Sequence, residues 1–345
     1  MNPATIESVS QQAGVSKTTV SRYLNGKFEH MSAKTKARIK ETIEALDYQP
    51  NLIARSLKLK KTGLIGVIVP DIINPVTVNL VKGVIDHCTQ EGYQVVIASS
   101  DEQSDKEKEY VLSMLNRKVE GLIVNIADYN NYDLLKTLTE RGEKIVLADR
   151  TICDSILDMV TTDNYNMTRT VVKALYEKGY EAVGFFSPEL LKSNVRLTRY
   201  NAFLDESAGK LAYLLHNENE YKKAIQDFLS KTQGKKAAIF ASTPMSLLNV
   251  VSGIHELNLK TPEDIGICGY DNLPWTKLVG GGISVVEQPL YEVGWESAKI
   301  LIDRIKNGID NPVKYVELKS KLILRNSTGD NVTVNQSWKE IIKND

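Results

Sequence analysis

Short apolar runs that alternate with amphipathic helical segments constrain the fold of this chain more than any other feature. Nine runs typical of buried strands follow residue 63, and they form two series. The first series occupies 64–70, 94–100, 121–126 and 144–149, and the second occupies 182–187, 211–216, 237–242, 265–271 and 283–288. Strands that alternate with helices are typical of parallel sheets covered on both faces, so two series predict two doubly wound parallel sheets. Such sheets bind ligands beyond the carboxyl ends of their strands, and the cleft between them is the expected pocket.

The first sixty residues have short helical patterns instead, which start at Thr5, at Ser16 and in the segment 32–48. The formal net charge of the chain is zero, but residues 1–61 hold eleven basic and five acidic side chains. This part therefore carries a net charge of +6, and the remaining residues carry −6. A basic head on an acidic body is expected of a module that binds a polyanion. Solvated lysines on a helical surface would give the same composition, so composition alone leaves both alternatives open.

The stretch AGVSKTTVSRYLNG, residues 13–26, predicts two helices joined by a tight glycine turn, which is the helix-turn-helix arrangement. The second helix carries side chains suited to DNA. Lys17 and Arg22 can bind guanine edges, and Thr18 can contact thymine. Side chains suited to phosphates are Ser16, Thr19, Ser21 and Asn25, and we add Thr5 at the start of the first helix to the DNA-binding set. The alternative is a generic helical hairpin with a solvated face.

Residues 4–26, ATIESVSQQAGVSKTTVSRYLNG, closely resemble the opening of the LacI (lactose-repressor) family of transcription regulators. The shared frame is TI-x-x-V-x-x-x-AGVS-x-x-TVSR-x-LN. The resemblance continues through LDYQPNLIARSLKLKKTGLIGVIVPDIINP, EGYQVVIASSDEQ, VEGLIVNI, VTTDNY, IGICGYDN and ISVVEQP, so it covers about residues 1–329. It implies that Lys17, Thr18 and Arg22 lie against bases in the major groove.

The basic segment that follows the head, PNLIARSLKLKK, is not polar or glycine-rich as most linkers are, and it predicts one short helix over about 51–58. The resemblance implies a hinge helix that folds on operator DNA and pairs with its dimer mate in the minor groove. It also implies that Leu57 is an apolar wedge between base steps. The DNA-binding set in this segment is Asn51, Ala54, Arg55, Leu57 and Lys58. The alternative is that Leu57 packs the helix onto the head.

The resemblance also implies an α/β body like the periplasmic binding proteins, with two subdomains joined by three crossovers. The expected domains are a head at 1–50, a hinge at 51–62, a body at 63–330 and a tail at 331–345. Within the body we expect a first subdomain, 63–161 plus 290–320, and a second subdomain, 162–289 plus 321–329. The first subdomain should carry the dimer surface. The tail has no sustained heptad, which argues for a homodimer rather than a coiled-coil tetramer.

Other function classes find little support. The chain has no GxGxxG after its first strand, no complete P-loop, no GxSxG and no metal-ligand spacing among its four histidines, so we expect no enzyme, cofactor or metal site. A sugar-binding protein of a transport system is the alternative, but it would lack this head and would need a secretion signal. No signal peptide or long apolar segment is evident, so we expect a cytoplasmic protein that does not enter the membrane.

The resemblance places ligand-contacting residues in the cleft. Arg199 and Asp271 match family contacts, with a surface ion pair as the alternative, and Asn125 and Asp149 follow strands at pocket positions. The full effector-binding set is Asn74, Asn125, Asp149, Arg150, Arg196, Arg199, Thr243, Asp271 and Trp275. Trp275 either replaces a stacking aromatic that the family often has after Asn74-Pro75 or anchors a buried loop.

Two departures from the family indicate the kind of effector. Ser242-Thr243 replaces the usual Asn-Asp, which removes a carboxylate, while Lys192, Arg196 and Arg150 add positive charge near the cleft. More arginines and fewer acids favour an anionic effector, a sugar acid or sugar phosphate. The ketodeoxygluconate-responsive branch of the family is similar to this chain in the segments YLNGKFEHMSAKTKARI and GYDNLPWTKLVGGGISVVEQP, which implies 2-keto-3-deoxygluconate as the effector.

Together, the head and the family resemblance predict a dimeric, sequence-specific transcription regulator. We expect it to be a repressor that binds a pseudo-palindromic double-stranded operator.

Overall fold

The computed structural model describes residues 4–48, 62–152, 154–190, 193–308 and 312–330. The chain divides into two compact units, Met1–Gly63 and Leu64–Asp345. They are called the head and the body below, and each is described by itself. The predicted hinge helix and the tail lie outside the described residues.

The head consists of three helices, α1 (Ile6–Gln12), α2 (Lys17–Leu24) and α3 (Ala33–Ala45). Each helix follows a hydroxyl side chain that accepts a backbone N–H of the first turn: Thr5 from Ser8, Ser16 from Thr19 and Ser32 from Thr35. Gly14, between α1 and α2, has a φ of +59°, which a glycine adopts without steric cost, so the turn can be short. The helices bury a small core of Val9, Ala13, Val20 and Ile39.

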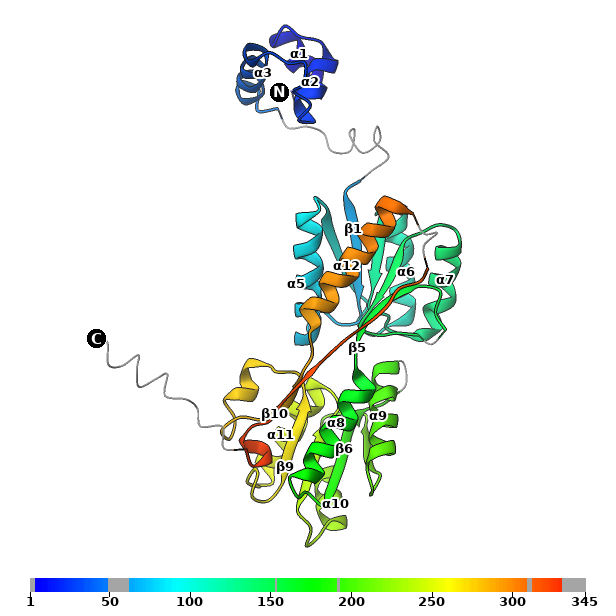
Figure 1. Ribbon diagram of the computed structural model, residues 1–345, viewed down its shortest axis with the longest axis vertical. Coiled ribbons are helices and arrows are strands. Elements are labelled where there is room, and N and C mark those ends of the chain that lie inside the picture. The colour runs from blue at the N-terminus through cyan, green and yellow to red at the C-terminus, as the bar shows by residue number, and fades with distance from the viewer. Residues whose placement is uncertain (1–3, 49–61, 153, 191–192, 309–311, 331–345) are drawn as a thin grey trace, which may run out of the picture. The chain divides into compact units, whose positions relative to one another are not determined.

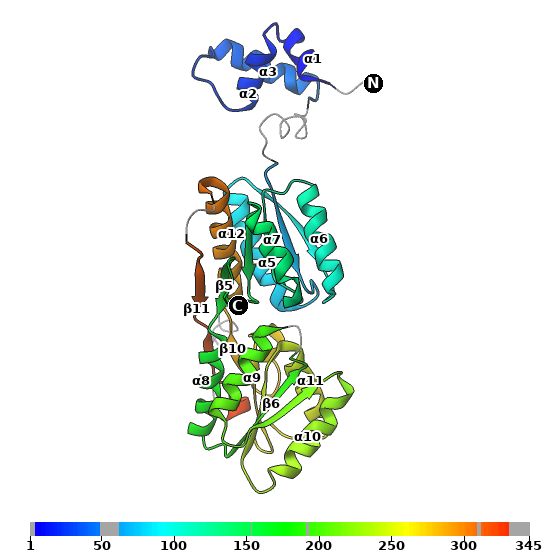
Figure 2. The ribbon, with the colours of Figure 1, turned by 90° about the vertical axis from the view of Figure 1, so that its right-hand side faces the viewer.

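The body contains two six-stranded sheets (Figures 1 and 2). The first sheet has the order β11-β5-β4-β3-β1-β2, and all of its strands are parallel. Its strands are β1 (Leu64–Val69), β2 (Gln94–Ser99), β3 (Gly121–Val124), β4 (Ile145–Ala148), β5 (Asp158–Thr162) and β11 (Tyr315–Leu318). Its helices are α5 (Pro75–Gln90), α6 (Ser104–Asn116), α7 (Tyr132–Glu140) and α12 (Leu290–Asn307), with the short 3-10 helix η1 (Tyr129–Asn131) before α7.

The second sheet has the order β12-β10-β9-β8-β6-β7 and is parallel except for β12, which runs antiparallel to β10. Its strands are β6 (Ala182–Pro188), β7 (Leu211–Leu215), β8 (Ala237–Ala241), β9 (Gly266–Tyr270), β10 (Ser284–Glu287) and β12 (Lys321–Ile323). Its helices are α8 (Asn164–Glu177), α9 (Asn194–Glu206), α10 (Asn219–Lys231) and α11 (Pro244–Glu256), with 3-10 helices η2 (Pro274–Lys277) and η3 (Asn326–Thr328).

The central strands are buried along their length because helices cover both faces of each sheet. Successive residues of β1 show this: Val67 and Val69 join the core beside α5 and α12, whereas Ile68 joins the core beside α6 and α7. The second sheet is built in the same way. Phe240 belongs to its core beside α8 and α9, and Ile239 to its core beside α10 and α11.

The chain passes between the two sheets three times. It leaves the first sheet after β5 and enters α8, returns after β10 to enter α12, and crosses again between β11 and β12. Only two residues, Lys319 and Ser320, separate β11 from β12, so this last crossing is one nearly continuous extended segment (Figure 1). β5, β11 and β12 had not been predicted as strands, since β11 and β12 are short and partly exposed and do not form apolar runs. Among the described residues, no helix combines the length and apolarity that crossing a bilayer requires.

Candidate functional site

The exposed face of α2 carries the predicted base-contacting residues. Lys17, Thr18 and Arg22 are all exposed, whereas Val20 is fully buried. At about 100° per residue, Lys17, Thr18, Ser21, Arg22 and Asn25 fall within an arc of about 140° on the side away from Val20. The Lys17 ammonium forms an exposed ion pair with Glu7 at 2.8 Å. Exposed pairs of this kind contribute little stability, so Lys17 can change partner at small cost.

Several hydroxyl residues of the predicted DNA-binding set also shape the helices. The Thr5 hydroxyl accepts the Ser8 N–H at 3.2 Å, and the Ser8 hydroxyl accepts the Thr5 N–H at 2.9 Å, which forms a capping box. The Ser16 hydroxyl accepts the Thr19 N–H at 3.1 Å, and the Asn25 amide donates to the Ser21 carbonyl at 2.7 Å. These contacts fix both ends of α2. The predicted hinge contacts Asn51, Ala54, Arg55, Leu57 and Lys58 lie outside the described residues, as does Lys192.

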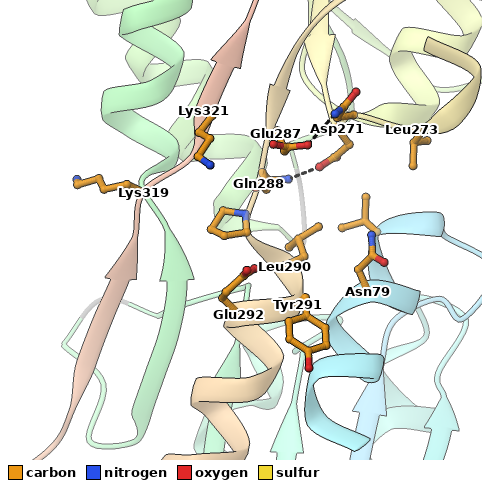
Figure 3. Close-up of a pocket in the computed structure, with 13 residues that line it drawn as sticks. Asn79, Asp271, Leu273, Glu287, Gln288, Leu290, Tyr291, Glu292, Lys319 and Lys321 are labelled. Atoms are coloured by element: carbon orange, nitrogen blue, oxygen red, sulfur yellow. Dashed lines mark hydrogen bonds between the residues drawn. The ribbon is translucent and has the colours of Figure 1, made fainter. Parts of the chain in front are cut away.

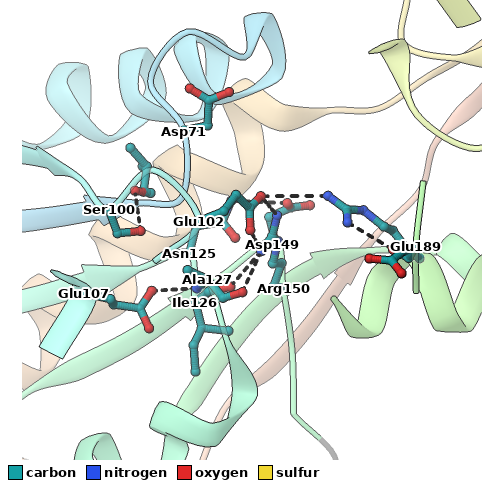
Figure 4. A network of polar contacts seen from close by, with 12 residues as sticks. Asp71, Ser100, Glu102, Glu107, Asn125, Ile126, Ala127, Asp149, Arg150 and Glu189 are labelled. Atoms are coloured by element: carbon teal, nitrogen blue, oxygen red, sulfur yellow. Dashed lines mark hydrogen bonds and ion pairs between the residues drawn. The ribbon is translucent and has the colours of Figure 1, made fainter. Parts of the chain in front are cut away.

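In the body, polar side chains gather where the strands of both sheets end. Asn125 follows β3, Asp149 follows β4 and Asp271 follows β9. The Asn125 amide donates to the Asp149 carboxylate at 3.3 Å (Figure 4). The structure therefore brings the predicted residues Asn125 and Asp149 together at the strand ends of the first sheet. Asp271 lies at a strand end of the second sheet.

Arg199, on α9, is 4% exposed and forms three side-chain hydrogen bonds. Its guanidinium donates to the Asn164 side-chain oxygen at 2.7 Å, the Ser242 carbonyl at 2.6 Å and the Gln288 side-chain oxygen at 2.8 Å. The guanidinium carbon also lies 3.4 Å from the ring centroid of Tyr270. The surface-ion-pair alternative for Arg199 is therefore wrong, because the side chain is buried inside the body.

Gln288, in the second crossover, links Arg199 to Asp271. Its side-chain oxygen accepts from Arg199 and from the Thr162 hydroxyl at 2.9 Å, and its amide donates to Asp271 Oδ1 at 2.8 Å (Figure 3). Burial raises the pKa of Asp271 to about 6, against the opposing positive charge of Arg199. Burial also raises the pKa of Asp149, which Arg199 and Arg150 oppose. The charge of Asp149 raises the pKa of Asp271 further, so the two carboxylates interact.

Arg150 is held by a glutamate that the sequence analysis did not select. Its guanidinium donates to both oxygens of Glu102, at 2.6 and 3.1 Å, and to the carbonyls of Ile126 and Ala127 at 3.2 and 3.1 Å (Figure 4). Arg196, on α9, donates to the Glu189 carbonyl at 3.1 Å and lies 3.8 Å from Glu102. Glu102 thus lies between an arginine of each subdomain.

Four buried polar atoms at the strand ends have no hydrogen-bond partner among the described residues. They are Asn125 Oδ1, Ser187 Oγ, Ser242 Oγ and Asp271 Oδ2. They follow or end β3, β6, β8 and β9, so both sheets contribute. A buried polar atom without a partner is costly, and such atoms are normally satisfied by protein, water or a ligand. Their position marks these strand ends as a binding site.

The remaining predicted residues have structural partners. Asn74 caps α5 by accepting the Val76 N–H at 3.1 Å, and Thr243 caps α11 by accepting the Ser246 N–H at 3.1 Å. Trp275, in η2, packs partly buried against the core beside α10 and α11, as the loop-anchor alternative predicted. Its role as a stacking aromatic for the effector stays a prediction.

A pocket next to Asp271 and Gln288 extends along the second and third crossovers (Figure 3). Its polar lining includes Asn79, Glu287, Glu292, Lys319 and Lys321. Sequence reasoning missed these residues, as it missed Glu102, Asn164 and Gln288. The position of two of them after a strand was a signal in the sequence: Gln288 directly follows β10, and Glu102 lies three residues after β2. Their hydrogen-bond partners, however, are distant in sequence. Among the described residues, no group of His, Cys, Asp and Glu could hold a metal ion.

Two family models match the chain. The model described as bacterial regulatory proteins, lacI family, matches residues 5–51, and the model described as periplasmic binding protein-like domain matches residues 172–328. The first covers the three-helix head and the second covers all six strands of the second sheet.

Curated relatives and solved structures cover nearly the whole chain. The HTH-type transcriptional regulator KdgR of Bacillus subtilis (strain 168) is 35% identical over 331 residues, which are 94% of this chain and 97% of that protein. A crystal structure of the lac repressor dimer bound to operator and the anti-inducer ONPF has a TM-score of 0.83 at 20% identity and covers 95% of this chain and 99% of that one. A complex of the transcriptional regulator CelR with cellobiose has a TM-score of 0.67 at 24% identity, over 94% and 99% of the two chains.

These similarities confirm the predicted fold class, a helix-turn-helix head joined to a body of two parallel-sheet subdomains. The relatives are transcriptional regulators rather than enzymes, which supports a non-enzymatic role. The chain belongs to the LacI family of bacterial regulatory proteins and is a DNA-binding transcriptional regulator.

Proposed function

We propose that this protein is a cytoplasmic homodimeric repressor that binds a pseudo-palindromic operator and is controlled by an anionic sugar acid, such as 2-keto-3-deoxygluconate, in the cleft of its body. Two heads related by two-fold symmetry would read the two halves of the operator. The polar face of α2 supports base contact, with Lys17, Thr18 and Arg22 exposed together. The likeness to the lac repressor dimer on its operator supports the same assembly here.

The observation that carries the effector proposal is the group of four unpartnered polar atoms, Asn125 Oδ1, Ser187 Oγ, Ser242 Oγ and Asp271 Oδ2. They offer acceptors and hydroxyl donors, which suit the several hydroxyl groups of a carbohydrate. Residues from both sheets contribute, so a ligand at this site would couple its binding to the relative position of the subdomains.

The arginines near the cleft support a negative charge on the effector. Arg196 is near enough to Arg150 and Arg199 that both lower its pKa, in addition to the larger effect of burial. A carboxylate would relieve this repulsion and can bind a guanidinium through two parallel hydrogen bonds.

A neutral sugar is the second candidate. Asp149 and Asp271 place two carboxylates at the strand ends, and carboxylates accept hydrogen bonds from sugar hydroxyls. The regulator CelR, which has been solved with cellobiose, shares the fold. A transport binding protein is disfavoured because the helix-turn-helix head has no use in transport.

The test measures operator binding and ligand binding together. Full-length protein would select its operator from random duplex DNA, and fluorescence anisotropy at fixed salt would follow its affinity with 2-keto-3-deoxygluconate, gluconate, galacturonate, glucose or galactose. We expect a sugar acid to change operator affinity at least about tenfold while neutral sugars leave it unchanged. Tight binding of a neutral sugar alone would contradict the anionic effector, and no preference for any duplex would contradict the regulator.

A further inference from the structure

Glu102 occupies an unusual place between the two subdomains. It follows β2 in the first subdomain, and its carboxylate accepts two hydrogen bonds from Arg150 of the same subdomain at 2.6 and 3.1 Å (Figure 4). The same carboxylate lies 3.8 Å from Arg196, which α9 of the second subdomain provides. One acidic side chain therefore faces arginines from both sides of the cleft.

The three arginines differ in how fully their donors are used. Arg150 and Arg199 each donate to three different residues at 3.2 Å or less and are at most 8% exposed. Arg196 donates one hydrogen bond to the described residues, to the Glu189 carbonyl at 3.1 Å, and its side chain is 23% exposed. Its contact with Glu102, at 3.8 Å, is longer than a hydrogen bond. The Arg196 guanidinium thus keeps N–H groups that can donate hydrogen bonds to an oxygen of a ligand.

The backbone indicates that Glu102 is held for a purpose other than local stability. Asp101 and Glu102 have φ values of +52° and +56°, a left-handed conformation that is uncommon outside glycine, asparagine and aspartate. Two consecutive residues in this region are costly and tend to occur at functional positions. The loop is tied to the sheet through the Glu102 N–H, which donates to the Pro70 carbonyl at 2.8 Å.

We propose that Arg196 binds the carboxylate of the anionic effector and that Glu102 is an internal anion that competes for it. This inference rests on the proposed function and names the residues of that site that recognise charge. Glu102 stays paired with Arg150, while the effector carboxylate replaces it beside Arg196. The hydroxyl groups of the effector then reach the unpartnered atoms at the strand ends.

Competition of this kind sets how tightly the cleft binds an acid and leaves the binding of neutral sugars unaffected. A neutral sugar offers no charge with which to replace Glu102, so Arg196 keeps its internal partner and contributes nothing to binding. A sugar acid gains a charge-assisted pair and opposes the repulsion among the three arginines. Glu102 therefore lowers the affinity of the cleft for acids, and it also lowers the affinity for other small anions.

The test compares full-length wild-type protein with Glu102→Gln and Arg196→Gln by isothermal titration calorimetry. The probes are 2-keto-3-deoxygluconate, gluconate and galacturonate, with glucose and galactose as neutral counterparts. Glu102→Gln keeps an oxygen that accepts from Arg150 but removes the charge, so we expect at least about tenfold tighter binding of the best sugar acid. Arg196→Gln should weaken that acid at least about tenfold and leave neutral sugars within about twofold.

A matched control removes an equal charge nearby. Glu189→Gln alters a carboxylate that pairs with the exposed His216 at 2.9 Å, and it should leave acid affinity within about twofold. The double variant Glu102→Gln/Arg196→Gln should bind acids no better than Arg196→Gln alone, because the competition needs both side chains.

The outcomes separate the two proposals. If wild-type protein binds a sugar acid but Glu102→Gln binds it no more tightly, the competition is overturned and the proposed function stands. Should Glu102→Gln fail to fold, an Arg196→Gln variant with wild-type acid affinity would overturn the inference by itself. If neither the wild type nor any variant binds an acid of the panel, the inference and the anionic effector are both overturned.

Discussion

Asp149 and Asp271 show how single residues are placed to meet a ligand. They follow β4 and β9 with φ values of +69° and +77°, so each backbone turns sharply as its strand ends. Aspartate tolerates this conformation better than most residues. Each turn brings a carboxylate to the cleft, and Arg199 offsets part of the cost of burying both.

Replacing Asp271 by asparagine should stabilise the body at neutral pH and abolish the effector response. The native pKa of Asp271 is about 6, above its ordinary 3.8, so the native state binds more protons than the unfolded state between these values. The free energy of unfolding of the wild type therefore falls as pH rises from about 4 to 6 and then stays level. Asp271→Asn has no carboxyl group at this position and does not lose this stability. At pH 7.5 its free energy of unfolding should therefore exceed that of the wild type by up to about 3 kcal/mol.

Thermal unfolding at pH 4.5 and 7.5 measures this difference. Asp105→Asn is the control, because the Asp105 side chain is fully exposed and its replacement should change neither value. An advantage of Asp271→Asn that is equal at both pH values would contradict the assignment.

Lys17 and Thr18 should choose the operator sequence. Changing both, as Lys17→Gln/Thr18→Ala, should redirect the preferred base pairs, because each specific contact contributes about 1–3 kcal/mol of discrimination. Selection from random duplex DNA gives the preferred sites. Lys34→Gln, which removes an exposed charge of α3, should keep the wild-type site and lose affinity for all duplexes alike. An unchanged site in the double variant would contradict the assignment.

At the scale of single residues the sequence predicted strand-end positions well and pairings poorly. Asn125, Asp149 and Asp271 could be placed because a residue that follows a buried run must lie at the edge of the sheet. The pairings of Glu102 and Gln288 could not be predicted, because their partners Arg150 and Arg199 lie 48 and 89 residues away in the chain. The expectation of few acids in the cleft therefore overlooked a glutamate.

Among the helices, α5 and α12 cross at two glycines. A Cβ atom on Gly83 would overlap the Tyr291 carbonyl, and one on Gly294 would overlap the Leu80 carbonyl. Glycine is required at both positions because backbone lies against backbone. α12 begins two residues after Gln288, so this packing connects the cleft directly to the first subdomain.

Gly83→Ala should destabilise the first subdomain by about 3 kcal/mol or more, since neither helix backbone can move aside without disturbing the core. Urea unfolding measures the loss. Thr89→Ala, on an exposed position of the same helix, is the matched control and should change stability by less than about 0.5 kcal/mol. A fully stable Gly83→Ala protein would show that the helices separate more readily than their packing implies.

The hinge segment lies outside the described residues, and its role remains a prediction of the sequence. Leu57→Ala should weaken specific operator binding by more than about 2 kcal/mol and leave binding to random duplex nearly unchanged, because only bent operator offers a step for the wedge. Anisotropy with both duplexes at one salt concentration separates the two effects. Leu59→Ala is the control for the loss of an apolar side chain. If Leu57→Ala loses equal affinity for both duplexes, Leu57 does not act as a wedge.

For the whole molecule, the alternation of strands and helices predicted two sheets because the nine buried runs fall into two series. The paths between the sheets were implied by family resemblance and not by periodicity. β5, β11 and β12 illustrate the reason: a crossing strand is short, or is shared between environments, and loses the continuous apolar pattern.

Effector and operator should influence each other by equal factors. If a sugar acid changes the operator Kd by a given factor, saturating operator must change the Kd of the acid by the same factor, because both ligands act on one equilibrium. Calorimetry of the acid with and without operator duplex tests this. Unequal factors would require a third linked process, such as a change of assembly. An Arg196→Gln protein should lose both effects together.

The final crossing has a mechanical consequence. Lys319 and Ser320 join β11 to β12 without slack, and the Ser320 N–H is fastened to the Asp163 carboxylate at 2.8 Å beside the first crossing. A connection this short limits how far the two halves of the body can separate, so rotation about the crossings is the motion it leaves open. A molecule that binds in the cleft would then act by favouring one relative orientation of the halves, whichever side chains line the cleft.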